Sequence, residues 1–263
     1  MSQAQRIIKY FAIGLAALLI VGIFFLIVDG FGMIGNLFTD NKKDIDLENI
    51  ELSDDNYKSL EIELALSELV IVDGKNFKIE SNKKFVNVKE KDGILIIEEK
   101  NRKINNNANK VIVTVPKKYN FSDVSIETGA GKVNINNINT NELDLELGAG
   151  KVNVAGVNVS RETDIEGGVG KVKISDCNFN NLNLGIGVGD ADIEGIFMGY
   201  TNVETGIGNV KIKLLDGIDN YKFSIEKGIG SIYVNNEEVD NGVYGNGSKR
   251  VFIDGGVGSI KIS

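Results

Sequence analysis

Carboxylates recur at one fixed place in this sequence, two residues before a Gly-x-Gly motif. The residues at this place are Glu127, Glu146, Glu166, Glu204, Glu226 and Asp254. If the units that carry them stack about 5 Å apart, neighbouring carboxylates either repel one another or share a cation. The column is therefore a candidate for a calcium ladder or for docking a basic partner. The alternative is a solvated outer surface whose charges are partly paired.

Lysines stand three residues after the first glycine of the same motif in the early units. These are Lys132, Lys151 and Lys171. We expect them to lie across the same corner and to relieve the charge of the carboxylates. Later units carry other residues there, namely Asp190, Asn209, Ser231 and Ser259. Any cation or basic partner is therefore expected to favour residues 185–258, with Glu204, Glu226 and Asp254 as candidates.

Asp190 and Asp192, in the stretch GVGDADIEG, are a second acidic candidate. They resemble half of a calcium-binding nonapeptide, but that motif needs Gly-Gly-x-Gly-x-Asp at a period of nine. The motif spacing around them is 19 residues, which disfavours a specific metal site.

Paired carboxylates could also serve a polysaccharide-cleaving enzyme, which needs two of them at a defined separation in a cleft. Short, uniform corners offer no long loops to build such a cleft. The long insert 235–249 is instead rich in glycine and asparagine. We predict that the protein is not an enzyme and that it needs no cofactor.

The stretch GAGK at 129–132 invites interpretation as a phosphate-binding loop. A Walker loop requires G-x-x-x-x-G-K-[S/T], so that backbone amides surround the phosphates and a hydroxyl meets the metal. Here Val133 follows the lysine, and Ile126 stands where the first glycine is required. The dinucleotide fingerprint fails as well, because Asn134 occupies the place of its third glycine. Neither nucleotide site fits.

The glycine motif itself indicates what positions these side chains. Its first glycines stand 19, 20, 19, 19, 22 and 28 residues apart, and a period near 20 is typical of stacked supersecondary units. The corner pairs are Gly129 and Gly131, Gly148 and Gly150, Gly168 and Gly170, Gly187 and Gly189, Gly206 and Gly208, Gly228 and Gly230, and Gly256 and Gly258.

Apolar residues align with the motif three residues before it and four and six residues after its first glycine. The last two positions alternate with polar residues, which is the period of a strand with one buried face. Each unit is thus predicted to be a strand, a Gly-x-Gly corner, a strand and an Asn-rich turn. Glycine suits the corner because it accepts positive φ, and the apolar residue between the two glycines is expected to point inward. The predicted fold is an all-β, parallel β-solenoid of about 19–20-residue repeats with one continuous core.

The first half of the repeat region is a degraded version of these units. Leu60–Val72 aligns on Val124–Asn136, with Ala65 and Ser67 in place of the glycines. Further on, Lys91-Asp92-Gly93 predicts a hairpin between two alternating runs.

The far end of the chain is predicted to leave an open edge. Ser263 ends the last predicted strand, so no later residue covers it, and an open edge invites pairing with another chain. The insert 235–249 is the one segment that could fold over this edge.

A membrane anchor is predicted before the repeats. Residues 10–28 contain no charge and would form a helix about 28 Å long, close to the thickness of a bilayer core. Arg6 and Lys9 precede this segment, so the positive-inside rule places the N-terminus in the cytoplasm. A cleaved signal peptide is disfavoured because VDGFGMIGN offers no small-residue exit site. The predicted parts are a cytoplasmic tail (1–9), a transmembrane helix (10–28), a juxtamembrane linker (29–56) and an extracytoplasmic solenoid (57–263).

Composition narrows the chemistry further. The formal net charge of −8 disfavours nucleic acid as a partner. The chain has no histidine, which removes the commonest general base and neutral metal ligand. Its single cysteine, Cys177, rules out an internal disulfide and is expected to be a small core residue.

Several stretches resemble a bacterial family of putative adhesins, a domain of unknown function that includes LiaG-like cell-envelope proteins. They are VNVKEKDGILIIEEK, VIVTVPKKYNFSDVSIETGAGKVNI and the later repeats GAGKVNV, GVGKVKI and GIGNVKI. The resemblance covers about residues 57–263. It implies the repeat fold, and it implies no catalytic residue.

We therefore expect a membrane-anchored, extracytoplasmic interaction module, tied to envelope-stress sensing or signalling. A nine-residue tail can hardly hold a signalling domain, so any signal must pass through a membrane protein partner. The alternative, which the family label implies, is an adhesin that binds cell-wall or surface glycans. An aromatic content of 7% without tryptophan weighs against sugar stacking. The least favoured hypothesis is a polysaccharide-active enzyme.

Overall fold

The computed structural model describes residues 47–82, 84–100 and 109–263. The predicted cytoplasmic tail, the predicted transmembrane helix at 10–28 and residues 29–46 of the linker lie outside the described residues. Within the described ranges, no helix is both long and apolar enough to cross a bilayer. Strand structure begins inside the predicted linker, because residues 48–50 pair with residues 79–81.

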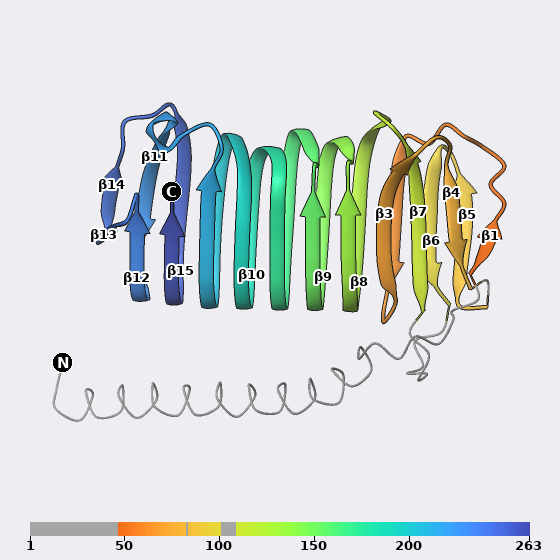
Figure 1. Cartoon of the computed structure of the whole chain (residues 1–263), viewed down its shortest axis with the longest axis horizontal. Helices are drawn as coiled ribbons and strands as arrows, with labels where there is room; N and C mark the ends of the chain where they lie inside the picture. The colour runs from red at the N-terminus through yellow and green to blue at the C-terminus, as the bar shows by residue number, and fades with distance from the viewer. Residues whose placement is uncertain (1–46, 83, 101–108) are drawn as a thin grey trace, which may run out of the picture. The chain divides into compact units, whose positions relative to one another are not determined.

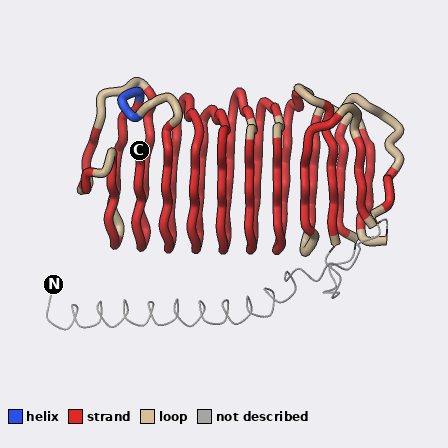
Figure 2. Tube along the Cα trace, viewed as in Figure 1, coloured by secondary structure: helices blue, strands red, loops and turns tan. Residues whose placement is uncertain are grey.

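The described chain is all-β, as predicted, and its strands belong to one sheet (Figure 1). The strands are β1 (Glu48–Ile50), β2 (Ser59–Leu64), β3 (Glu68–Gly74), β4 (Lys78–Ser81), β5 (Val86–Lys91), β6 (Ile94–Glu99), β7 (Lys110–Pro116), β8 (Asn120–Asn136), β9 (Asn139–Ala155), β10 (Asn158–Leu214), β11 (Tyr221–Glu226), β12 (Ile229–Val234), β13 (Glu237–Val239), β14 (Gly242–Tyr244) and β15 (Lys249–Ile262). A single turn of 3-10 helix, η1 (Ile218–Asn220), precedes β11 (Figure 2).

From β8 to β10, successive units pair in parallel, each with the unit that follows it 19 or 20 residues later. Ile126 of β8 lies beside Leu145 of β9, which lies beside Ile165 of β10. The same pairing runs through the corners and continues into the second strand of each unit. Figure 1 shows the resulting row of similar turns of chain. A side chain that recurs in the sequence is thereby placed in a column across the sheet.

The core lies between the strand before the corner and the strand after it. Residues three before and four after the first glycine are at most 6% exposed and belong to one apolar cluster. Burying such Ile, Leu and Val side chains stabilises the fold by about 1.5–3 kcal/mol each. Both strands of a unit face this cluster. Their outward side chains therefore lie on opposite sides of the stack that the units form.

The corners require glycine for two reasons. The second glycine of each pair has a positive φ, for example +146° at Gly208. A Cβ atom there would also lie only 1.7 Å from the carbonyl oxygen of Gly189 in the adjacent unit. The positive φ was predicted from the sequence, and the close approach to the adjacent unit is a second reason that the structure adds.

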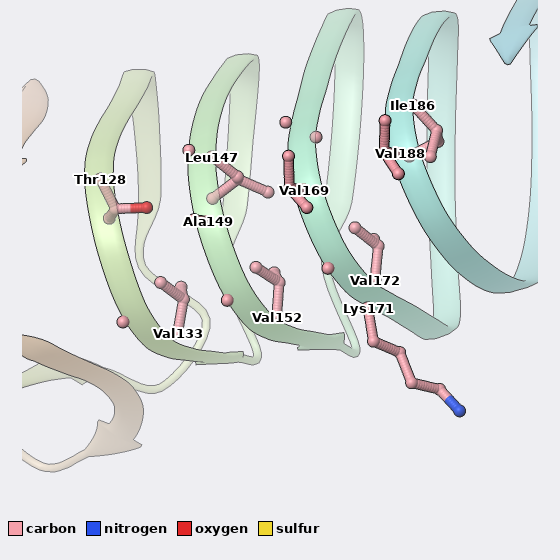
Figure 3. A pocket seen from close by; sticks show the side chains of 16 residues that line it. Thr128, Val133, Leu147, Ala149, Val152, Val169, Lys171, Val172, Ile186 and Val188 are labelled. Atoms are coloured by element: carbon pink, nitrogen blue, oxygen red, sulfur yellow. The ribbon is translucent and has the colours of Figure 1, made fainter. Parts of the chain in front are cut away.

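The residue between the two glycines does not point inward, which corrects the sequence-based expectation. Val169 and its equivalents are partly exposed, and Val257 is 45% exposed. The interior of the corner is already occupied by residues before and after the motif, such as Leu147 and Val152 (Figure 3). The middle residue is left on the outside of the bend.

The C-terminal end differs from the predicted order of units. β15 does not form the edge. It pairs in parallel with β10 on one side and with β11 and β12 on the other. The outermost unit is therefore β11 and β12, and it is covered by antiparallel β14 and β13 from the insert 235–249. The insert does fold over the end, but the edge that it covers is not the one predicted.

The N-terminal end has the same construction in reverse chain order. β2 and β3 pair with β8, with Leu60 beside Val124 and Leu69 beside Val133, as the glycine-free alignment predicted. β6 and β7 stack outside them in parallel, and antiparallel β5 and β4 cover that unit. The predicted hairpin at Lys91-Asp92-Gly93 joins β5 to β6.

A polar clamp holds the inserted strand at the C-terminal end. The Tyr221 hydroxyl donates to Asp216 Oδ1 at 2.6 Å and accepts from the Phe197 N–H at 3.1 Å. Asp216 also pairs with Lys249, the first residue of β15. Burial would raise the pKa of Asp216, but the hydrogen bonds from Lys249 and Tyr221 hold it below its usual value. The turn before β11 and the start of β15 are thus tied together.

Replacing a corner glycine should destabilise the fold strongly. We expect Gly208→Ala to lower the free energy of unfolding by roughly 2–5 kcal/mol, because the new Cβ meets a backbone oxygen and φ is unfavourable. Gly185→Ala is the matched control, since its Cβ would meet no heavy atom within 4 Å. Urea unfolding of both variants measures the difference. Equal stabilities would contradict the corner geometry.

Candidate binding surface

The strands before the corners present an acidic surface. Its outward carboxylates come from four neighbouring strand segments, in β2, β8, β9 and the start of β10, that pair in register. They are Glu61, Glu63, Asp123, Glu127, Glu142, Asp144, Glu146, Glu162, Asp164 and Glu166. Arg161 forms an ion pair with Glu142 at 3.0 Å. The repeat therefore arranges like charges in columns across the strands, and neighbouring residues of one column are about 4.8 Å apart.

The crowding changes the acidity of two of these groups. Burial, and then the charge of Asp164, raise the pKa of Asp144. The charge of Asp144 is the largest cause that raises the pKa of Glu146, followed by burial and by Glu127 and Glu166. These carboxylates thus repel one another through the parallel ladder.

The lysine column does not relieve this repulsion, contrary to the expectation from sequence. Lys132, Lys151 and Lys171 begin the strands after the corner and lie in register with one another. Outward side chains of these strands face the opposite side of the stack from the acidic surface. Among the ion pairs of the described residues, the one that involves this column joins Lys171 to Asp192, at 4.0 Å.

Three of the predicted site residues are brought together. Asp254 lies in register between Glu204 and Glu226, an order that the sequence does not show. Glu204 accepts a hydrogen bond from Asn202 Nδ2 at 2.8 Å. Across the ranges that the structure describes, no cluster of acidic, His or Cys side chains has the arrangement to hold a metal ion.

The other two predicted site residues lie elsewhere. Asp190 and Asp192 stand on the lysine side of the stack. Asp190 accepts a hydrogen bond from Asn209 at 3.1 Å, and Asp192 lies 3.8 Å from the ammonium of Lys211. They are part of a mixed polar ladder and are separate from the column of Glu204, Asp254 and Glu226.

Two exposed aromatic residues were missed by the sequence reasoning. The rings of Tyr200 and Phe252 stack at 6.4 Å with an interplanar angle of 23°. They are 58% and 42% exposed. A signal for Phe252 existed, because it alternates with buried Val251 and Ile253 and so had to face outward. Its contact with Tyr200 could not be foreseen, because it depends on β15 lying next to β10.

A groove of about 440 Å³ lies beside the acidic residues of the last units. The small side chain of Ser224 stands in register between Phe252 and Val243, which leaves a hollow in this row. The lining residues are Ser224, Ile225, Glu226, Lys227, Gly228, Asn241, Gly242, Val243 and Asp254. We call this groove together with Tyr200 and Phe252 the C-terminal patch.

The cavity inside the corners is much smaller. It measures about 20 Å³ and lies among residues such as Leu147, Val172 and Ile186 (Figure 3). A space of this size holds about one water molecule. The C-terminal patch is therefore the more plausible place for a ligand to bind.

Cys177 is a buried core residue. Its side chain is fully enclosed, and Sγ donates to the carbonyl oxygen of Ser175 at 3.2 Å. Burial raises the pKa of the thiol to about 11, so the thiolate needed for nucleophilic chemistry is scarce at neutral pH.

A known protein family matches most of the chain. The family model described as Toastrack DUF4097 matches residues 40–244. A putative cell adhesion protein from Clostridium sporogenes is 20% identical, with 82% of this chain and 97% of that chain covered and a TM-score of 0.39. A putative adhesin from Bacteroides fragilis is 13% identical, with 84% and 98% covered and a TM-score of 0.34. A putative adhesin from Parabacteroides distasonis is 12% identical, with the same coverage and a TM-score of 0.33. No curated protein sequence matches the chain.

Removing one repelling carboxylate should stabilise the protein at neutral pH. A carboxyl whose folded pKa is raised costs stability when ionised, and this cost disappears as the pH falls through that pKa. We therefore expect Asp144→Asn to raise the melting temperature at pH 7. The gain should vanish below the ordinary pKa of Asp, about 3.9.

Thermal unfolding between pH 3 and pH 8 measures this effect. Glu237→Gln, an exposed carboxyl in β13, is the control and should change little. A lower melting temperature for Asp144→Asn at pH 7 would mean that the acidic surface is not repulsive.

Proposed function

Because the chain belongs to the Toastrack DUF4097 family, we propose that residues 47–263 form a β-solenoid binding module of the adhesin kind. The single observation that carries the proposal is the C-terminal patch. Tyr200 and Phe252 expose a stacked aromatic pair beside a groove that holds two carboxylates. Exposed aromatic side chains are enriched at interfaces and often dominate their binding energy.

The patch has the chemistry to recognise a saccharide. Aromatic rings pack against the apolar face of a sugar, and carboxylate and amide groups accept or donate hydrogen bonds to its hydroxyls. Glu226, Asp254 and Asn241 supply such groups in the groove. This arrangement offsets the low aromatic content of the chain, since two of its few aromatics are placed together on the surface.

We propose that the module binds its ligand without cleaving it. Glu226 and Asp254 are both exposed to solvent. Glycoside cleavage instead relies on a carboxylic acid in a site from which water is largely excluded. The uniform short corners leave the patch as an open surface on one side of the stack.

The cellular setting follows from the sequence. The predicted anchor at 10–28 would hold the module on the outer side of the cell membrane, where surface glycans lie. Signalling of envelope stress through a membrane protein partner stays a prediction from the resemblance. Calcium binding by Glu204, Asp254 and Glu226 is likewise a prediction.

Co-sedimentation with isolated cell walls tests the proposed function. We expect the full-length protein in detergent to pellet with the walls. The double change Tyr200→Ser and Phe252→Ser should reduce the bound fraction about tenfold or more, because it removes the aromatic contacts. Leu215→Ser is the matched control, since Leu215 is equally exposed but lies in the turn after β10.

Two further experiments separate the contribution of the carboxylates from that of a bridging cation. Glu226→Gln with Asp254→Asn tests the carboxylates, and addition of calcium or a chelator tests a bridging cation. If the aromatic variant pellets as well as the control, the patch is not the binding surface. If no form pellets under any condition, direct wall binding is wrong and a protein partner should be sought by cross-linking.

A further inference from the structure

An apolar ridge runs along the outside of the glycine corners. It consists of the residue between the two glycines of each unit, and these residues pair in register through the sheet. In spatial order the corner ridge is Ala130, Ala149, Val169, Val188, Ile207, Val257 and Ile229. Ile207, Val257 and Ile229 are 36%, 45% and 76% exposed. The side chains thus grow larger and more exposed toward the C-terminal end.

The aligned, exposed apolar side chains of the ridge indicate an interaction surface. Single exposed apolar residues are common, but contiguous ones mark interaction sites. At about 4.8 Å per unit, seven positions extend over roughly 30 Å. The ridge is also separate from the aromatic pair of the C-terminal patch, because Tyr200 lies seven residues before Ile207 on the same strand segment.

Opposite charges flank the ridge on its two sides. In three consecutive units a glutamate stands three residues before the ridge residue and a lysine stands two residues after it. These pairs are Glu127 and Lys132, Glu146 and Lys151, and Glu166 and Lys171. Within the described chain, no ion pair joins a glutamate of this set to a lysine of this set. Lys171 lies 4.0 Å from Asp192, and the other members of the two columns are available to a partner that carries the reverse arrangement.

A second copy of the chain carries that arrangement when it is turned about an axis parallel to the ridge. This two-fold rotation exchanges the two sides of the stack, so the glutamate side of one copy lies beside the lysine side of the other. A two-fold rotation about an axis perpendicular to the ridge would make the two copies antiparallel. It leaves the glutamate columns of both copies on the same side, so glutamate would lie beside glutamate. Charge complementarity thus favours one symmetry over the other.

We propose that the corner ridge is a self-association surface on which two copies pack ridge against ridge, parallel and in register. Glu127, Glu146 and Glu166 of each copy face the lysine column of the other. The apolar ridge residues meet their own counterparts along the axis. The raised pKa of Glu146 in the single chain agrees with an acidic column that lacks its cations.

The proposed dimer has consequences for binding. It leaves the two C-terminal patches on opposite sides, so one dimer presents two ligand sites and gains avidity on a repetitive surface. Both folded domains also begin at the same end of the dimer. This shared polarity suits two copies that are attached to one membrane by the predicted anchor at 10–28.

Cysteine cross-linking tests the symmetry directly. Ala149→Cys and Val257→Cys are single changes near opposite ends of the ridge, made in the full-length protein in detergent. In the parallel dimer each new cysteine lies beside the same cysteine of the other copy, within reach of a disulfide. We expect both variants to form covalent dimers on mild oxidation. Leu215→Cys, exposed but away from the ridge, is the control and should stay monomeric, as should the parent chain with its buried Cys177.

The alternatives give other results. An antiparallel packing would cross-link position 149 to position 257 only when the two variants are mixed. That result, or the absence of cross-linking at both positions, would overturn the proposal. Neither outcome bears on wall binding, because the aromatic residues of the patch are unchanged.

A charge swap provides the second test. Glu146→Lys and Lys151→Glu should each weaken dimerisation by at least about tenfold, because each change creates two like-charge contacts. The double variant restores both contacts with exchanged signs, so its dimer should return. Sedimentation velocity of the full-length protein measures the three variants. Failure of the double variant to recover, with unchanged circular dichroism, would contradict the proposed contacts.

Discussion

The close approach of backbone to backbone at the glycine corners is the constraint on which the rest of the structure depends. In six of the seven corners, a Cβ on the second glycine would lie 1.7–1.9 Å from a carbonyl oxygen of the adjacent unit. No side chain can enter this space, so the units stack without a gap and keep their register through the bend. The buried columns of Ile, Leu and Val then align into one core. The corner thus sets both the spacing of the units and the direction of every outward side chain.

Strict register turns sequence repetition into surface chemistry. A carboxylate that recurs every 19 or 20 residues becomes a column of like charges. Burial and then the charge of Asp164 raise the pKa of Asp144, and the charge of Asp144 is the largest cause that raises the pKa of Glu146. A repeated apolar residue at the bend becomes a ridge. The aromatic pair arises differently, because Tyr200 and Phe252 come from units that are far apart in sequence. Columns made by repetition form the stacked core and the proposed self-association surface, whereas the departure from sequence order at the C-terminal end creates the patch.

Much of this architecture could be read from the sequence. The all-β class, the alignment of Leu60–Val72 and the hairpin at Lys91-Asp92-Gly93 follow from periodicity and turn chemistry, which are local. The position of β15 could not be predicted, because sequence order suggests that the last unit stacks last. The clamp of Tyr221, Asp216 and Lys249 shows what stabilises the inserted order, but these residues become neighbours only after folding. The expected pairing of lysines with the glutamate column failed for a similar reason, since spacing along the chain does not reveal that the corner separates the two sides.

The patch and the place of Val257 in the ridge both depend on β15 lying between β10 and β12. Paired cysteines can measure it. Lys211 and Lys261 are neighbours in the observed register, and Lys261 in turn lies beside Tyr233. This register predicts that Lys211→Cys with Lys261→Cys forms an intramolecular disulfide, whereas Lys211→Cys with Tyr233→Cys does not. A disulfide in the second pair and none in the first would show that the units stack in sequence order, and it would contradict the position of β15 between β10 and β12.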